Sequence, residues 1–456
     1  MINSPQFKAH ELKKKRIVSE LKEAKKHKLG VALKKSTTNL FRDRQQDVQT
    51  KKIDVRVFNK VLHIDKKNRI ATVEGMTTYE ALVDETLKHG LMPAVVPELK
   101  SITIGGATSG VGLENSSFRY GFVHETIEEM EILLGDGRIV IANKTNNYKD
   151  LFFGFPNTYG TLGYLLSVKV KLVPVKKYVK IERKKYTSPV LLFQDLKNLS
   201  LQNRVNGTFD FIIAFAFSEN DLYLELGTFV DEAPFVSDYT YMNIFYKSIP
   251  QKKLDYLTIR DYIWRLDTDW FWNSRHFFLE NPLIRFLWGR KNLNSKAFMK
   301  VKDWSIRYGI RKVVERALYP NMEGIIQDVE VEVDRAAEFF SWLAKAVGIF
   351  PIAIGPTTVY DEKSHYTFFR LDPNKVNMNI GFYGFVKSDN AFGYYNKKIE
   401  QKVMQMGAQK MLYSDCFYSP EDFWRIYDKR AYDGLKRKYD NSGVLKGLYE
   451  KVVKRK

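Results

Sequence analysis

Hydrophobic and polar positions alternate with a period of two over residues 167–172, where Ser and Lys take turns with Val and Leu. This pattern is typical of a strand with one buried face. Two further segments with the pattern of strands, residues 125–134 and 138–142, flank a Gly-Asp-Gly triplet at 135–137. Because such a triplet between strands is a hairpin signal, the first half of the chain is predicted to contain antiparallel strands.

A strand and a capped helix precede this hairpin. Residues 69–74 have the composition of a strand, and Thr77 with Glu80 forms a capping box that opens a helix. Gly90 ends that helix ahead of Pro93. Strand and helix thus lead into the glycine-rich segment that follows.

A second set of elements begins after Pro174, where the last of these strands ends. The pattern predicts strands at residues 178–186, 209–217 and 222–230, then strand, helix and strand at 324–333, 334–346 and 349–354, and again at 377–385, 394–406 and 410–413. Two strand-helix-strand units in succession indicate a ferredoxin-like arrangement. Ser419 as N-cap and Pro420 at the first helical position begin a further helix.

Residues 102–121, ITIGGATSGVGLENSSFRYG, contain five glycines and five Ser or Thr residues. Glycine lets the backbone approach an anion closely, and hydroxyl groups add hydrogen-bond donors for phosphate or ribityl oxygens. The spacing fits neither a P-loop nor the dinucleotide fingerprint of a Rossmann fold. A different nucleotide-binding design is therefore expected.

The order TIGG, GxG, SS, YG, DG, DLF and GTLG along the chain resembles the FAD-binding domain of flavoproteins of the vanillyl-alcohol-oxidase type. Within them the chain is similar to the delta(24)-sterol reductase (diminuto/seladin-like) branch. That similarity rests on VVPELKSITIGGATSGVGLENSSFRYG, DLFFGFPNTYGTLG, DTDWFWNSR, IIQDVEVEVDRAAEF and EDFWRIYDKRAYDGLKRKYD, which with the first flavin loop span residues 33–440.

The resemblance implies an α+β fold, with a two-subdomain PCMH-type FAD-binding domain and a cap domain built from an antiparallel sheet and ferredoxin-like helices. The corresponding boundaries are a basic N-terminal helix at 1–28, the FAD-binding domain at 29–177, the cap at 178–415 and C-terminal helices returning to the FAD-binding domain at 416–456. One departure concerns the first flavin loop, residues 33–42, which contains no glycine. Pyrophosphate contact there would depend on hydroxyl groups, Asn39 and lysines.

The FAD-binding residues that the motifs and the resemblance imply lie in the first loop, the glycine-rich segment and the GTLG turn. They are Lys35, Ser36, Thr37, Asn39, Pro97, Thr103, Ile104, Gly105, Gly106, Ser109, Gly110, Gly112, Ser116, Ser117, Gly121, His124, Thr161 and Gly163. Covalent flavin attachment requires a His or Cys beside the ring, and the first loop has neither. We therefore expect non-covalent FAD, with His124 and Cys416 as isolated alternatives.

Residues 256–288 contain ten aromatic residues, including Trp270 and Trp272. Such a density fills a large core or lines an apolar pocket, and the interspersed charged residues favour a pocket for a long hydrophobic substrate with one polar end. Cap strands in the resembling family present residues to the flavin. The strand IIQDVEV therefore nominates Gln327 for the substrate, with Val329 on the same face of the strand, and the strand NIGFY nominates Asn379. The alternative for Gln327 and Asn379 is a structural hydrogen bond.

The segment MLYSDC nominates Tyr413 as a proton donor and Asp415 beside it. Tyr418 and His276 are alternatives for the proton-donating role. The seven histidines form no short-spaced cluster, so no metal site is expected.

The net charge is +20, and much of the excess lies near the two ends of the chain. A basic surface can serve an anionic membrane, a phosphate-bearing cofactor or no partner at all, and no nucleic-acid-binding motif accompanies it. Residues 7–28 form a basic helix that either lies on an anionic bilayer or packs its narrow apolar stripe on the FAD-binding domain. Without a signal peptide or an apolar run of membrane-spanning length, we expect a cytoplasmic protein that can be peripheral at a membrane. Oligomeric state is not predicted.

The sequence is compatible with three functions. The leading expectation is an FAD-dependent oxidoreductase that reduces a C=C bond of a sterol or isoprenoid, with NADPH as electron source. An FAD-dependent oxidase or dehydrogenase of an alcohol, lactone or sugar derivative is the alternative. A basic non-enzymatic binding protein is the third, and it would leave the glycine-rich loop unexplained.

Overall fold

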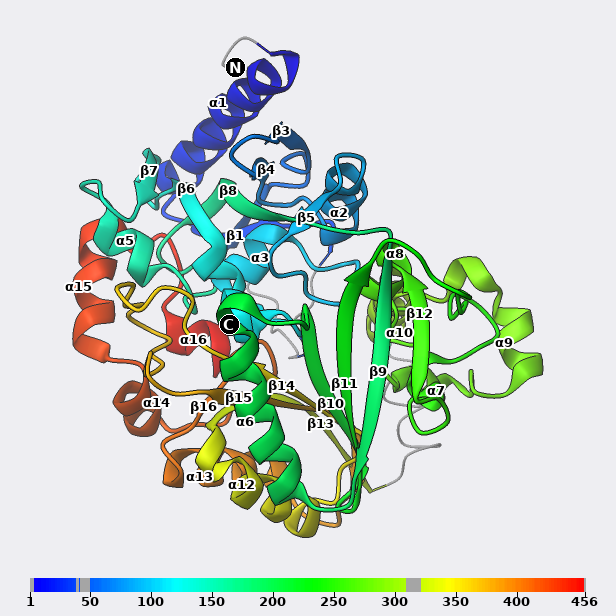
Figure 1. The fold of residues 1–456 in the computed structure, drawn as a ribbon. Helices are drawn as coiled ribbons and strands as arrows, with labels where there is room; N and C mark the ends of the chain where they lie inside the picture. The colour runs from blue at the N-terminus through cyan, green and yellow to red at the C-terminus, as the bar shows by residue number, and fades with distance from the viewer. Residues whose placement is uncertain (1–3, 38–40, 42–49, 309–320, 455–456) are drawn as a thin grey trace.

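A computed structural model of the protein describes residues 4–37, 41, 50–308 and 321–454. Besides one two-stranded parallel sheet it contains two large sheets, one from each half of the chain, that lie one above the other in Figure 1. The predicted α+β class is confirmed, because both sheets are antiparallel and helices cover their outer faces.

The first sheet is six-stranded and follows the order β3-β4-β8-β6-β7, with β5 also paired to β8. Its strands are β3 (Val61–Asp65), β4 (Ile70–Glu74), β5 (Leu91–Pro93), β6 (Ile127–Leu133), β7 (Ile139–Asn143) and β8 (Tyr164–Pro174). The hairpin and the alternating strand agree with the sequence pattern, since Val168, Val170 and Leu172 of β8 are buried. Helix α2 (Tyr79–Leu87) is capped by Thr78 rather than Thr77, because the Thr78 side chain accepts from the N–H of Ala81.

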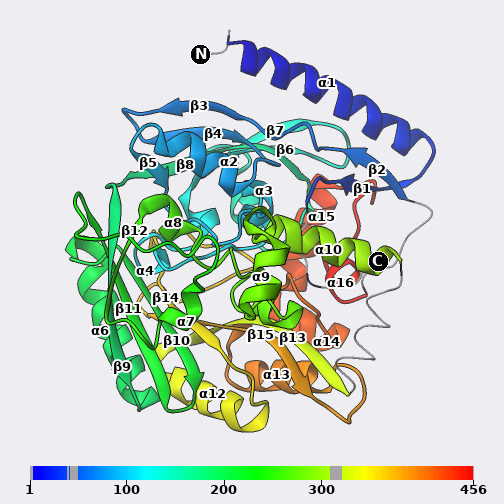
Figure 2. The same cartoon turned by 90° about the vertical axis from the view of Figure 1, so that its right-hand side faces the viewer.

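Helix α1 (Pro5–Lys26) lies along the outside of this first sheet in both views (Figures 1 and 2). It buries Ile17, Leu21 and Ala24 in a cluster shared with β1 (Gly30–Lys34) and β2 (Thr50–Asp54), which pair in parallel. The apolar stripe of the basic helix is thus occupied by contacts within the protein, which is the packing alternative drawn from the sequence.

A buried ion cluster fixes the start of α1. Nδ1 and Nε2 of His10 lie 2.7 Å from Glu74 and 2.6 Å from Glu131, and Lys13 and Lys14 pair with the same two carboxylates. Burial lowers the pKa of His10, but the hydrogen bonds to Glu131 and Glu74 outweigh it and raise the pKa to about 9. His10 is therefore a cation that bridges α1 to β4 and β6.

The second sheet is eight-stranded, in the order β12-β9-β11-β10-β14-β15-β13-β16. Its strands are β9 (Tyr178–Tyr186), β10 (Phe211–Ser218), β11 (Asp221–Val230), β12 (Leu254–Thr258), β13 (Met322–Glu332), β14 (Ile352–Thr357), β15 (Asn377–Lys387) and β16 (Gln409–Lys410). Strands β9 to β12 form one half of this order, and β13 to β16 form the other. In each half the first strand along the chain (β9 or β13) lies between the third (β11 or β15) and the fourth (β12 or β16). The second strand (β10 or β14) lies at the centre of the sheet. That is the ferredoxin-like order, and it occurs twice, joined where β10 pairs with β14.

Helices α6 (Pro189–Asn206), α12 (Val333–Ala346) and α13 (Tyr394–Gln405) cover one face of this sheet (Figure 1). Residues 325, 329 and 331 of β13 and 378, 380 and 382 of β15 point into the core under these helices. The opposite face, with the even-numbered residues of β13, is turned toward the first sheet. The predicted last strand, 410–413, is shorter than expected and ends at Lys410, after which the N–H of Met411 bonds to the carbonyl of Asp328.

Short helices complete the fold. In the first half they are α3 (Ile104–Ser109), α4 (Ser117–Tyr120) and α5 (Lys149–Gly154), and in the second half α7 (Phe245–Ser248), α8 (Ile259–Ile263), α9 (Pro282–Trp288) and α10 (Ser295–Arg307). The C-terminal helices are α14 (Pro420–Ile426), α15 (Lys429–Tyr439) and α16 (Leu448–Val452). The last helices return to the first half, since Lys438 and Tyr439 of α15 both bond to Asp150 of α5.

Candidate functional site

A cavity of about 1730 Å³ opens between the two sheets. The first half contributes β1, the loop after it and the segment from Pro97 to Asn115, and the second half contributes the inner face of β13, β14 and β15. Binding pockets for single small molecules are typically about 300–1,000 Å³. This cavity is therefore large enough for a dinucleotide together with a second molecule.

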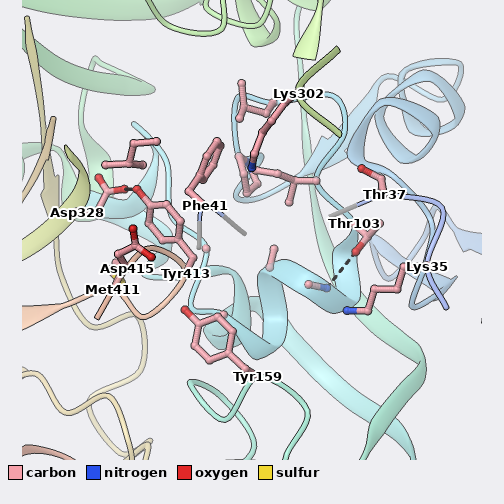
Figure 3. Close-up of a pocket in the computed structure, with 18 of the residues that line it drawn as sticks. Lys35, Thr37, Phe41, Thr103, Tyr159, Lys302, Asp328, Met411, Tyr413 and Asp415 are labelled. Carbon is pink, nitrogen blue, oxygen red and sulfur yellow. Dashed lines mark hydrogen bonds between the residues drawn. The ribbon is translucent and has the colours of Figure 1, made fainter. Parts of the chain in front are cut away.

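One end of the cavity is rich in glycine, hydroxyl groups and lysine. Thr103 accepts a hydrogen bond from the N–H of Gly106 at 3.2 Å and lies opposite Lys35 and Thr37 of the first loop (Figure 3). Taken over the cavity as a whole, and not over this end alone, the lining lysines are Lys34, Lys35, Lys52, Lys302, Lys446 and Lys451. Hydroxyl donors and ammonium groups around close-approaching backbone suit a diphosphate. The residues present thus fit FAD, with its pyrophosphate at this end.

Gly105 and Gly106, at this end of the cavity, are glycines for different structural reasons. A Cβ on Gly105 would lie 2.6 Å from the carbonyl oxygen of Gly75, so Gly105 is required for α3 to pack on the end of β4. A Cβ on Gly106 would meet only the Thr103 hydroxyl, at 3.0 Å, and would otherwise face open space. Gly105 therefore has a packing role, and Gly106 leaves room for a ligand.

Most of the nominated FAD residues line the cavity. These are Lys35, Ser36, Thr37, Pro97, Thr103, Gly105, Gly106, Ser109, Gly110, Gly112 and Gly163. Asn39 lies outside the described residues. The nominated residues that do not line the cavity are Ile104, Ser116, Ser117, Gly121, His124 and Thr161.

This second group serves the fold instead. Ser116 and Thr161 donate to the carbonyls of Ala94 and Thr158, and Ser117 accepts from the N–H of Glu114. Gly121 has a φ of +65°, in the left-handed region, and a Cβ there would lie 2.2 Å from the Glu125 carboxylate. A run of hydroxyls and glycines in sequence thus divides into ligand-facing and turn-forming members.

His124 and Ile104 are packed in the interior. The His124 ring stacks on Phe122 and meets Tyr366 edge-on, with centroids 4.4 Å from the latter, and burial lowers the pKa of His124 to about 3. Neither His124 nor Cys416 lines the cavity, so neither is placed to bond a flavin. His276 is the histidine that the described lining contains, and burial lowers its pKa to about 4.

A carboxylate with two phenols lies in the wall formed by the second sheet. Tyr413 donates to Oδ2 of Asp328 at 2.5 Å, and Tyr383 donates to the same carboxylate at 2.9 Å. All three line the cavity, and Figure 3 shows the Tyr413 ring beside Asp328. Burial raises the pKa of Asp328 to about 6, although the two hydrogen bonds lower it. Burial also raises the pKa of both tyrosines well above the usual value.

Gln327, nominated for the cavity, is on the opposite face of β13. Its side chain is buried, and it hydrogen-bonds Asn396 of α13 at 2.8 Å. Val329, nominated with it, lies in the core beneath the helices. Successive residues of a strand point to opposite faces, so Asp328 is the neighbour that reaches the cavity. The signal was in the sequence, because Ile325, Val329 and Val331 mark the odd-numbered face as apolar.

Asn379 of β15 does line the cavity, next to a second buried acid. Its Nδ2 donates to Glu330 at 3.3 Å, and Thr357 also donates to Glu330. Burial raises the pKa of Glu330 to about 8, against the lowering effect of these two hydrogen bonds. Asp415 lines the cavity as well, close to Tyr413 in Figure 3.

The aromatic segment divides between cavity and core. Trp270 and Phe271 line the cavity, whereas Trp272 is fully buried and donates from Nε1 to the carbonyl of Tyr383 at 2.7 Å. Trp270 and Phe271 both have positive φ. The resulting turn directs the Trp270 side chain to the cavity and the Trp272 side chain to the core. Of the two nominated tryptophans, Trp270 therefore lines the cavity and Trp272 does not, while Phe271, which was not nominated, lines it as well.

Phe41 and Lys302 are cavity residues that sequence reasoning missed. The Phe41 ring lies 5.8 Å from Trp270 and 6.0 Å from Tyr413, and the Lys302 ammonium lies over it at 4.7 Å (Figure 3). Phe41 belongs to the first flavin loop and Lys302 to α10, and only the fold brings these two segments together.

Comparison with known proteins agrees with this site. Residues 13–143 match the family described as an FAD binding domain. This stretch holds the C-terminal part of α1 from residue 13 on, the first loop, the glycine-rich segment and most of the first sheet. The protein therefore contains an FAD-binding domain.

Relatives extend the similarity beyond that domain. The chain is 26% identical to a delta(24)-sterol reductase homolog of Caenorhabditis elegans, over 98% of this chain and 88% of that protein. It is 25% identical to the delta(24)-sterol reductase of Homo sapiens and 27% identical to that of Pisum sativum, covering 86% and 88% of this chain and 76% of each relative. The protein is an enzyme, an FAD-dependent oxidoreductase, and it is similar to delta(24)-sterol reductases along most of its length.

Two absences hold for residues 4–37, 41, 50–308 and 321–454. In that part of the chain no helix is long and apolar enough to cross a membrane. The same residues contain no group of three or more side chains suited to holding a metal ion.

Proposed function

We propose that the enzyme reduces a carbon–carbon double bond of a sterol or similar isoprenoid, with NADPH as the electron source and non-covalent FAD as the carrier. The observation that carries this proposal is the pairing, in one cavity, of a lysine- and hydroxyl-rich end with a buried Asp328–Tyr413 pair and apolar aromatic walls. The names of the relatives support the choice of a sterol.

The residues would divide the work by position. Lys35, Thr37, Thr103 and the glycines of α3 line the end suited to the pyrophosphate. Trp270, Phe271 and Phe385 line apolar wall suited to a hydrophobic substrate. Bound FAD supplies the hydride in such a reduction.

A reduction of this kind also needs a proton, and we assign its donation to Tyr413. Its hydroxyl would give the proton to the second carbon of the double bond and recover one from Asp328, to which it is already hydrogen-bonded at 2.5 Å. A pKa of about 6 lets Asp328 carry that proton near neutral pH. One hydride and one proton complete the saturated product.

Oxidation of an alcohol, lactone or sugar derivative is the competing outcome. Fold cannot separate the two directions, because chemistry depends on the site. The apolar wall and the acidic partner of Tyr413 favour reduction of a hydrophobic substrate. Anaerobic flavin reduction by NADPH, followed by mixing with a delta(24)-unsaturated sterol, tests the proposal, and release of intact FAD on acid precipitation tests the non-covalent attachment.

A further inference from the structure

Helix α9 has the opposite polarity from an ordinary surface helix. Leu283, Phe286 and Leu287 are 66%, 62% and 75% exposed, and Ile284 is 38% exposed, whereas Arg285 is only 1% exposed. A surface helix normally turns its apolar side chains to the core and its charged ones to water. We call the four exposed side chains the α9 surface, and a cluster of this kind marks a site of interaction.

An ion pair holds the helix in this orientation. Nη1 and Nη2 of Arg285 bond to Asp269 at 2.6 and 3.0 Å, and the guanidinium also bonds to the carbonyls of Tyr241 and Leu279. Asp269 is itself buried. Turning α9 over would leave that carboxylate buried without its partner, which is strongly unfavourable. The outward-facing apolar side is therefore built into the fold.

The α9 surface is joined to the wall of the cavity by aromatic packing. Trp288, at the end of α9, lies 5.9 Å from both Phe277 and Phe298, and Phe298 stacks on Trp270 at 5.7 Å. Trp270 and Phe277 line the cavity. A continuous layer of packed aromatic rings thus connects α9 to the wall of the candidate substrate site.

Helix α10 extends the same side of the molecule. It contributes Val301 and Trp304 to the cavity lining, and Trp304 is 55% exposed. In Figure 2 α9 and α10 lie together on the side facing the viewer, and in Figure 1 α9 forms the right-hand edge, away from α1. The exposed apolar side chains therefore stand beside one side of the cavity.

Charge indicates what covers this surface. Four exposed cations follow α9 in the chain: Arg290, Lys291, Lys296 and Lys300. Two of them have acidic neighbours, since Arg290 lies 3.4 Å from Asp238 and Lys296 pairs with Glu80. Protein–protein interfaces are depleted in lysine, whereas apolar and aromatic side chains beside lysines suit the boundary of an anionic bilayer.

We propose that the α9 surface docks the enzyme on an anionic membrane, so that a hydrophobic substrate enters the cavity from the bilayer past α10. The nature of the substrate rests on the proposed function, but the docking does not. It assigns membrane contact to α9 rather than to α1, whose apolar stripe is buried.

The test is sedimentation of the FAD-loaded protein with vesicles of phosphatidylcholine and phosphatidylserine, without substrate. The test variant is Leu283→Gln/Phe286→Gln/Leu287→Gln. The matched control is Val190→Gln/Leu191→Gln, which changes two side chains of α6 that are 63% and 57% exposed. Flavin absorbance shows that each variant is folded, and light scattering gives its size.

We expect the α9 variant to need at least about tenfold more lipid for half-maximal binding, because full burial of one Leu or Phe is worth more than a factor of ten. The α6 control should bind like the wild type, and vesicles without phosphatidylserine should bind more weakly. Equal binding by the α9 variant, or no binding by the wild type, would overturn the proposal. A wild-type dimer that the α9 variant converts to a monomer would assign the surface to a second copy of the chain instead. Vesicle binding is measured without substrate, so a failure of sterol turnover would contradict the proposed function and leave the docking proposal intact.

Discussion

The hydroxyl of Tyr413 donates a 2.5 Å hydrogen bond to Oδ2 of Asp328, although 85 residues separate them in the chain. Tyr413 follows the last strand of the second sheet, and Asp328 lies on the inner face of β13. The bond forms because β16 pairs with β13 at Lys410 and Val329, which brings the end of one segment over the centre of the other. A phenol and a buried acid are thereby held at the cavity wall.

Replacing Tyr413 by Phe removes the proposed proton donor and keeps the ring. We expect the rate of flavin reoxidation by substrate to fall about 10² to 10⁴-fold, the usual contribution of general acid catalysis, with little change in FAD content. Rapid mixing of the reduced enzyme with substrate measures this rate. Tyr418→Phe is the matched control, because Tyr418 is buried, does not line the cavity and makes no hydrogen bond through its hydroxyl within the described residues. An unchanged rate in the Tyr413 variant would remove it from the mechanism.

The pH dependence of the same step should follow Asp328. Its pKa is raised by burial to about 6. Below this pH the carboxylic acid can reprotonate Tyr413, so the rate of substrate reduction should fall as the pH rises through about 6. The profile of Asp328→Asn should lose that transition, and a rate that instead increases through the same range would indicate a base and hence the oxidative direction.

Asp328→Asn should also stabilise the folded protein at neutral pH. A pKa raised from 3.8 to about 6 means that the carboxylate costs stability above the unfolded-state pKa, by roughly 2 to 3 kcal/mol at pH 7. The gain should vanish below pH 4, where the acid is protonated in both states. Urea unfolding of the two proteins at pH 4 and pH 7 would reveal it, and equal stability at both pH values would contradict the raised pKa.

Gly105 and Gly106 should respond differently to alanine. Gly105→Ala forces a methyl group to 2.6 Å from the Gly75 carbonyl oxygen, whereas Gly106→Ala meets only the Thr103 hydroxyl at 3.0 Å. We expect the first variant to be destabilised and poor in FAD, and the second to fold with at most weaker FAD affinity. The larger Gly106→Val should fold but exclude the cofactor from the cavity. Normal FAD occupancy in folded Gly106→Val would mean that this glycine does not face the ligand.

The anchoring of α1 should weaken as the pH rises. His10 has its pKa raised to about 9, so its ion pairs stabilise the fold fully below pH 6.5, and this contribution is lost as the pH rises toward 9. His10→Gln should therefore cost about 2 kcal/mol at pH 6 and much less at pH 9.5. Denaturant unfolding at the two pH values measures this, and a cost that does not depend on pH would place the effect in packing alone.

Local patterns predicted most strands and helices but not how the segments meet. Alternation identified β8, because one face of this strand is buried, and the Gly-Asp-Gly triplet at 135–137 identified the β6–β7 hairpin. The ferredoxin-like order appeared once in the sequence and twice in the structure, since β12 is short and the segment between β11 and β12 contains no long helix.

Only part of the candidate site was predicted, because local patterns do not show which segments meet in the fold. Glycines and hydroxyls marked the loop that faces the cavity, yet they could not distinguish Gly106 from Gly121, which serves a turn. On β13 the choice of face decided between Gln327 and Asp328, and the apolar residues at 325, 329 and 331 held the answer. Phe41 and Lys302 depend on contacts between distant segments, which no local pattern contains.

The proposed reaction takes electrons from NADPH through FAD and uses them to saturate a sterol double bond. The most direct measurement follows the flavin absorbance of the purified protein under anaerobic conditions. We expect NADPH to bleach the flavin and a delta(24)-unsaturated sterol to restore its colour, with formation of the saturated sterol. Bleaching by an alcohol or sugar derivative, with no reoxidation by the sterol, would contradict it.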